Sequence, residues 1–81
     1  QDQRVEVYPN PTQGQLYIDY ALQGENIQLE VMNLNGQLVV QQHGLAQQDV
    51  LSLDLSDHAK GMYVVRLQSD RGAIVKKVLY Q

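Results

Sequence analysis

The sequence has no cysteine, tryptophan or phenylalanine, and only two prolines in 81 residues. Without cysteine the chain can form no disulfide, no thiolate metal site and no cysteine nucleophile. No apolar run approaches the ~20 residues that a membrane-spanning helix needs. Nothing near Gln1 resembles a removable leader, which would show a charged segment followed by an apolar stretch. We therefore expect a soluble domain that is part of a longer polypeptide.

Positive charge is also scarce. Six Lys and Arg stand against nine Asp and Glu, which gives a formal net charge of -3. Such a charge provides no electrostatic reason to bind phosphate backbones, so nucleic acid is not an expected partner. The length suits one domain and not two. At this size folding buries only roughly 60% of the surface of the unfolded chain, so we expect modest stability.

No stretch shows the periodicity of a helix. Apolar and polar residues instead alternate in short runs separated by Gly, Asn, Asp or Pro, the pattern of strands with one buried face.

The stretch from Gln41 to Gln48 is interpreted as a polar connection between sheets, and Ser56 to Gly61 as one helical turn or a wide loop. The predicted buried faces are Leu16, Ile18 and Tyr20; Ile27, Leu29 and Val31; Leu51, Leu53 and Leu55; and Tyr63, Val65 and Leu67. In the last run, Val75, Lys77 and Leu79 share one face, and Ile74, Lys76, Val78 and Tyr80 share the other.

About seven short strands with hairpin-like connections predict an all-β fold, an immunoglobulin-like antiparallel β-sandwich. A small barrel is the alternative fold. The Cys and Trp that mark antibody domains are absent, so the likeness is one of architecture only. We expect the domain to span residues 5–81 and residues 1–4 to be the remnant of a linker.

An Asn35-Gly36 pair lies between two alternating apolar runs. Asn-Gly is the strongest short-range hairpin signal because both residues tolerate positive φ. The sequence therefore predicts that Leu38 and Val40 return antiparallel beside Leu29 and Val31.

No catalytic, metal or cofactor site is expected. His43 and His58 are the only histidines and lack ligand spacing, and the scattered aspartates lack the pattern of a calcium loop, although separate turns could still gather calcium ligands. Ser52, Asp54 and His58 include the residue types of a hydrolytic triad, but no nucleophile elbow surrounds them. A sandwich of this size uses almost all its apolar side chains for its own core, so we expect no enzyme.

Three segments carry a family resemblance when they are considered together. The first is Val7-Tyr8-Pro9-Asn10-Pro11-Thr12-Gln13-Gly14-Gln15-Leu16, in which two prolines make a stiff corner and Gly14 lets the chain turn back. The second is Val31-Met32-Asn33-Leu34-Asn35-Gly36-Gln37-Leu38-Val39. The third joins Leu53-Asp54-Leu55, Lys60-Gly61-Met62-Tyr63-Val64-Val65-Arg66-Leu67 and the closing Lys76-Lys77-Val78-Leu79-Tyr80. In order and spacing the chain from Val5 onward resembles the type IX secretion sorting domain of proteins exported by Bacteroidota.

The resemblance implies a removable address for a cargo domain that precedes it. Such cargo folds in the periplasm, is recognised by an outer-membrane translocon, and is carried to the cell surface or released. A cell-surface peptidase of the system typically cuts the domain off and attaches the cargo to a lipopolysaccharide. The cut would fall upstream of Val5, near or before Gln1.

The resemblance also implies roles for individual residues. Recognition would involve Gly61, Tyr63, Lys77 and Val78. The structural motif would comprise Pro9, Asn10, Pro11, Gly14, Asn35 and Gly36. The chain departs from the family pattern at its end, which reads Tyr80-Gln81 in place of a purely aliphatic close.

Simpler roles are compatible with these. Gly61 permits a backbone geometry at a strand start, and Tyr63 packs in the core with its hydroxyl at the rim. Lys76 and Lys77 fall on opposite faces, and a lysine there protects an edge while the final strand stays free for strand addition by a receptor. Exposed edges would also allow a homodimer.

A second functional hypothesis is a fibronectin-like or carbohydrate-binding sandwich of a secreted enzyme. Tyrosines could stack on sugars, but alternation sends Tyr17 and Tyr20 to opposite faces, so the sequence predicts no aligned row.

Overall fold

The structure, a computed structural model, describes residues 3–81. In this part of the chain every regular element is a strand. The strands are β1 (Arg4–Tyr8), β2 (Gln15–Ala21), β3 (Ile27–Asn33), β4 (Leu38–Leu45), β5 (Gln48–Asp54), β6 (Gly61–Ser69) and β7 (Gly72–Tyr80). The described residues contain no helix with the length and apolarity needed to cross a membrane.

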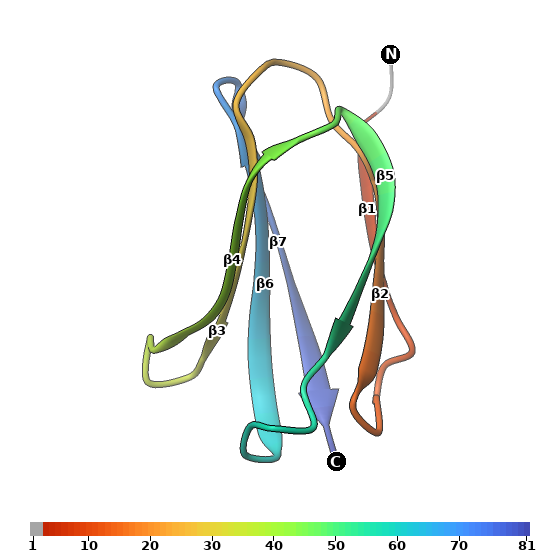
Figure 1. The fold of residues 1–81 in the computed structure, drawn as a ribbon, viewed down its shortest axis with the longest axis vertical. Helices are drawn as coiled ribbons and strands as arrows, with labels where there is room; N and C mark the ends of the chain where they lie inside the picture. The colour runs from red at the N-terminus through yellow and green to blue at the C-terminus, as the bar shows by residue number, and fades with distance from the viewer. Residues whose placement is uncertain (1–2) are drawn as a thin grey trace.

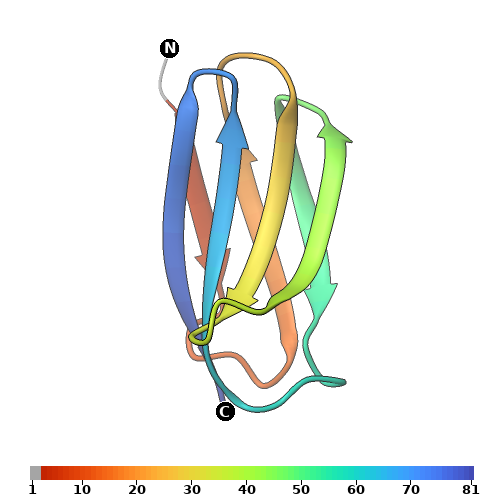
Figure 2. The same ribbon diagram turned by 90° about the vertical axis from the view of Figure 1, so that its left-hand side faces the viewer.

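The strands form two sheets that pack face to face (Figures 1 and 2). The three-stranded sheet has the order β1-β2-β5, and the four-stranded sheet has the order β4-β3-β6-β7. Every pairing between these strands is antiparallel. This arrangement confirms the predicted all-β antiparallel sandwich, and two separate sheets take the place of the alternative barrel.

One apolar core fills the space between the sheets, and it follows the predicted alternation. Fully buried side chains come from alternate positions of each central strand because successive residues point to opposite faces. The buried apolar residues are Val5, Leu16, Ile18, Tyr20, Leu22, Ile27, Leu29, Val31, Leu53, Leu55, Tyr63, Val65, Leu67, Val78 and Tyr80.

The connection between the sheets is shorter than the sequence predicts. The expectation of a polar linker from Gln41 to Gln48 is wrong, because β4 continues to Leu45 and β5 begins at Gln48. Only Ala46 and Gln47 make the crossing. The physical reason is that β4 is an edge strand paired with β3 alone, so its polar side chains can face water while its backbone stays in the ladder.

The hairpin between β3 and β4 forms, but its turn differs from the expected one. Val40 lies opposite Val31 as predicted, whereas a register shift places Leu38 opposite Met32. Gly36 has a φ of 81°, while Asn35 is not among the described residues with positive φ. The loop is therefore of the type that ends in a left-handed glycine.

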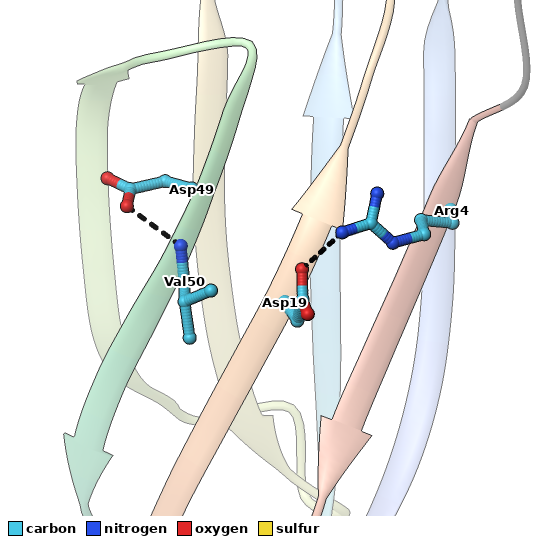
Figure 3. A network of polar contacts seen from close by, with 4 residues as sticks. All are labelled: Arg4, Asp19, Asp49 and Val50. Atoms are coloured by element: carbon cyan, nitrogen blue, oxygen red, sulfur yellow. Dashed lines mark hydrogen bonds and ion pairs between the residues drawn. The ribbon is translucent and has the colours of Figure 1, made fainter.

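β1 begins at Arg4, the last residue of the expected linker 1–4. Residues 1–2 of the expected linker lie outside the described residues, but Arg4 belongs to β1 and pairs with Ala21. Its guanidinium reaches the Asp19 carboxylate across the sheet at 2.6 Å (Figure 3). Both side chains are partly exposed, so the ion pair adds little to stability.

Tyr20 connects the core to the crossing between the sheets. Its ring is fully buried and its hydroxyl donates a hydrogen bond to the Ala46 carbonyl at 2.7 Å. Burial, and secondarily the carboxylate of Asp49, raise the pKa of Tyr20 above its ordinary value of 10.0. The folded domain therefore keeps this proton at a pH where the unfolded chain has lost it.

We expect a loss of stability in alkali that depends on Tyr20. A raised folded-state pKa gives stabilisation that is complete below about pH 10 and is lost as the pH rises through the folded-state value. The measurement compares the free energy of unfolding of the wild type and Tyr20→Phe at about pH 8 and about pH 11. The free energy of unfolding of the wild type should exceed that of Tyr20→Phe by less at the higher pH than at the lower pH. An advantage that stays constant would contradict this role.

Candidate functional site

The family-like segments gather at one end of the sandwich. The loops 9–14, 34–37 and 55–60 lie at this end together with the last residues of β7, whereas β1 begins at the opposite end (Figures 1 and 2). The long axis of the molecule measures 34 Å. We call this end, formed by the three loops and residues 78–81, the motif pole.

At the motif pole, the loop after β1 is bonded to the end of β7. The Asn10 side chain donates to the Lys77 carbonyl at 3.2 Å and accepts from the Leu79 amide at 3.0 Å. The Thr12 amide donates to the Leu79 carbonyl at 2.8 Å, and the Gln81 amide donates to the Thr12 carbonyl at 3.0 Å. The final strand was expected to keep a free edge, but from Lys77 onward that edge is occupied, so this expectation is wrong there.

Thr12 is a structural residue that the sequence reasoning missed. It is the fully buried polar residue among those described, and its hydroxyl donates to the Gln15 carbonyl and accepts from the Gly14 amide. The signal was available, because a threonine two residues before a glycine often closes such a turn with its hydroxyl. Gly14 has a φ of 135°, and its carbonyl accepts from the Leu55 amide at 2.9 Å. This bond fixes the loop 9–14 to the end of β5.

Gly61 and Tyr63 lie on β6 at the same end. Gly61 has a φ of 145°, a backbone conformation that residues with a side chain rarely adopt, although the space around it is open. Tyr63 is 3% exposed and its hydroxyl donates to the Ala59 carbonyl. A shallow groove of about 270 Å³ runs beside them, and its lining includes Leu34, which is 68% exposed.

Lys77 and Val78 are separated by the alternation of β7. Val78 is fully buried against the core, opposite Tyr63, whereas Lys77 is exposed on the outer face, opposite Val64. Two of the four sequence-predicted recognition residues, Tyr63 and Val78, are thus inside the sandwich.

Lys77 ends a row of side chains that crosses the outer face of the four-stranded sheet. In register, Leu38 pairs with Met32, Met32 with Val64, and Val64 with Lys77. We call these four residues the outer patch. In residues 3–81 the ion pairs are Arg4–Asp19 and Arg66–Glu30, and neither includes Lys77. The outer patch therefore presents apolar surface beside a cation that a carboxylate could pair with.

No group of three or more His, Asp or Glu side chains within residues 3–81 could hold a metal ion. The Asp54 carboxylate accepts a hydrogen bond from the Ser56 amide at 2.9 Å, and this bond lowers the pKa of Asp54. Ser52 accepts a bond from the Gln15 amide group at 3.2 Å. Asp54 thus bonds to a neighbour in its turn and Ser52 to a neighbour on the adjacent strand, which is what structural residues do.

The family model described as the secretion system C-terminal sorting domain matches residues 6–81, which includes the loops and strands of the motif pole. No curated protein matches the chain. Since the match covers almost the whole chain, the chain belongs to the family of C-terminal sorting domains of type IX secretion, as its motifs predicted.

Proposed function

We propose that this sorting domain is recognised through its motif pole and the adjoining outer patch by the outer-membrane translocon, and that a cell-surface peptidase then removes it and attaches the cargo. Membership of the family makes the domain a type IX sorting signal that directs export across the outer membrane of Bacteroidota. The observation that carries the proposal is the gathering of the family's motif segments at one end of the sandwich (Figure 1).

The arrangement of the two ends supports the order of these events. A cargo domain would join before β1, at the end opposite to the motif pole. The peptidase would cut upstream of Val5, near or before Gln1, while the translocon still contacts the motif pole. Recognition would then use the outer patch, Lys77 included, by direct contact. Gly61, Tyr63 and Val78 would act by holding that surface in shape, because a receptor can only contact what the fold displays.

A reporter fusion tests the proposal. Residues 1–81 are joined behind a reporter that carries a signal peptide, and the fusion is produced in a Bacteroidota host. We expect the reporter at the cell surface or in the medium, shortened by loss of the domain. A reporter that stays in the periplasm would refute the proposal, and a surface reporter that still carries the domain would refute the cleavage step.

The two adjacent lysines provide a matched test of the outer patch. Lys77 belongs to the patch, whereas Lys76 shares the inward face with Val78 at the strand edge. Lys77→Ala should reduce the exported fraction by about fivefold or more, the effect of removing a contact worth more than about 1 kcal/mol. Lys76→Ala should leave it near the wild-type value. Equal effects of the two substitutions would argue against the outer patch. Surface labelling of the reporter provides the measurement.

A receptor that adds a strand to this domain, or a homodimer that forms by strand pairing, would need a sheet edge other than the occupied end of β7. β1, β4 and β5 each lie at the edge of a sheet in the described structure, and so does the first half of β7. The proposed homodimer would use one of these edges, and light scattering of the 81-residue chain would detect it.

A carbohydrate-binding role is supported by a different observation. Tyr8 and Tyr17 face each other across β1 and β2 with ring centroids 5.7 Å apart, and they are 43% and 38% exposed. Exposed tyrosine rings can stack on the apolar faces of sugars. A polysaccharide pull-down that Tyr17→Ala abolishes, with export unchanged, would support this second candidate.

A further inference from the structure

The Asn10 side chain bridges two backbone groups of β7 that lie 67 and 69 residues away in the sequence. Together with the two backbone bonds of Thr12, it covers the edge of the chain from Lys77 in β7 to Gln81, the residue after β7. We call these four hydrogen bonds the edge clamp. A single asparagine that both donates to and accepts from one strand copies the way in which a neighbouring strand would pair.

The clamp occupies the groups that strand addition requires. In an antiparallel sheet the amide and carbonyl of alternate residues point toward the same edge, and a partner that adds a strand bonds to those groups. Lys77, Leu79 and Gln81 are such alternate residues, and the clamp bonds to all three. A receptor could pair with this stretch of β7 only after the clamp opens.

The clamp also determines how Lys77 is presented. Lys77 and Leu79 share the outer face of β7, and in the described structure β7 has a strand partner only on its β6 side. Strand ends that are paired on one side fray easily. Asn10 bonds on either side of Val78, to Lys77 and to Leu79, so it holds this end at the register that the buried Val78 sets.

We propose that Asn10 is a positioning residue for export: the machinery contacts the end of β7 in its clamped form, through outward side chains, and does not add a strand to residues 77–81. This inference rests on the proposed sorting function and assigns a mode of recognition to it. The partner surface would be apolar with a carboxylate opposite Lys77, matching the outer patch.

The test compares three substitutions. Asn10→Ala removes both side-chain bonds of the clamp. Asn10→Asp keeps an acceptor for the Leu79 amide but loses the donor to the Lys77 carbonyl. Asp70→Ala is the control, because the Asp70 carboxylate also bonds to a loop far away in the sequence, accepting from the Glu25 amide at 2.8 Å, but it lies in the turn between β6 and β7, at the end opposite to the motif pole.

The first readout is hydrogen exchange of the Leu79 amide in the 81-residue chain. Exchange should be about tenfold faster in Asn10→Ala than in the wild type and unchanged in Asp70→Ala. Equal exchange in the wild type and Asn10→Ala would overturn the clamp itself.

The second readout is export of the fused reporter. We expect Asn10→Ala to reduce the exported fraction by about fivefold or more, Asn10→Asp to be intermediate, and Asp70→Ala to be near wild type. Unchanged export of Asn10→Ala would overturn the positioning role, and increased export would overturn it in favour of strand addition. If Asn10→Ala does not fold, Asn10→Asp decides by the same criteria. A wild-type fusion that is not exported would instead refute the proposed function.

Discussion

Tyr63→Ala should lower the free energy of unfolding by about 3–5 kcal/mol, and Tyr63→Phe by only about 1 kcal/mol. The ring of Tyr63 is 3% exposed, so alanine leaves a large cavity in the core. Phenylalanine keeps the ring and loses only the hydrogen bond to the Ala59 carbonyl. A domain of this length has roughly 4–12 kcal/mol in total, so Tyr63→Ala removes much of its stability. Urea unfolding followed by circular dichroism measures both values.

The same pair of variants distinguishes a role of Tyr63 in the core from a direct contact between its hydroxyl and a partner. If Tyr63 acts through the core, Tyr63→Phe should be exported as well as the wild type, whereas Tyr63→Ala should be retained or degraded. A stable Tyr63→Phe variant that is not exported would mean that the hydroxyl contacts a partner. The assignment of Tyr63 to the core alone would then be wrong.

Val78→Asp should abolish cooperative folding at neutral pH. Val78 is fully buried opposite Tyr63, and the side chains of the core cluster around it are apolar. A buried unpaired charge costs several kcal/mol, about as much as the whole domain has. The measurement is the loss of the urea transition.

Lys77→Asp is the control for Val78→Asp, because it introduces the same group one residue away on the exposed face. Its free energy of unfolding should stay within about 0.5 kcal/mol of the wild type, as for most surface substitutions. A cooperative Val78→Asp variant, or an unfolded Lys77→Asp variant, would contradict the assigned orientation of β7. Export of Lys77→Asp should still fail, since the outer patch then carries the wrong charge.

The four residues that the family resemblance assigns to recognition differ in how far their side chains reach the surface. Of the four residues that the family resemblance assigns to recognition, Lys77 alone has an exposed side chain. Gly61 has no side chain, and Tyr63 and Val78 are buried. We infer that most substitutions in the motifs would act on export through the fold, and that Lys77 and its neighbours would act through contact.

Several features of the fold could be predicted from the sequence because they depend on local rules. Alternation placed Leu16, Ile18 and Tyr20 in the core, since a strand can bury only one face of a two-sided pleat. The Asn35-Gly36 pair located a hairpin, although the loop was longer than the expected two residues, because a left-handed glycine can close more than one turn type.

Other features could not be predicted because they depend on which strands become neighbours. Tyr17 was assigned to the outer face, but its stacking on Tyr8 follows from the register between β1 and β2. The length of β4 was missed because an edge strand needs no apolar side chain to continue its ladder, so polarity alone does not show where it ends.

The amino-acid sequence by itself determined the approximate number of strands and their buried faces, since both follow from the alternation of apolar and polar residues, and its motifs resemble those of the family to which the chain belongs. The tertiary structure decided that the Pro-Asn-Pro corner bonds to the last strand and that the motifs share one pole. The physical reason is that side-chain alternation is a local property of a strand. A hydrogen bond between residues 10 and 79 instead exists only where the packing of the two sheets brings these residues together.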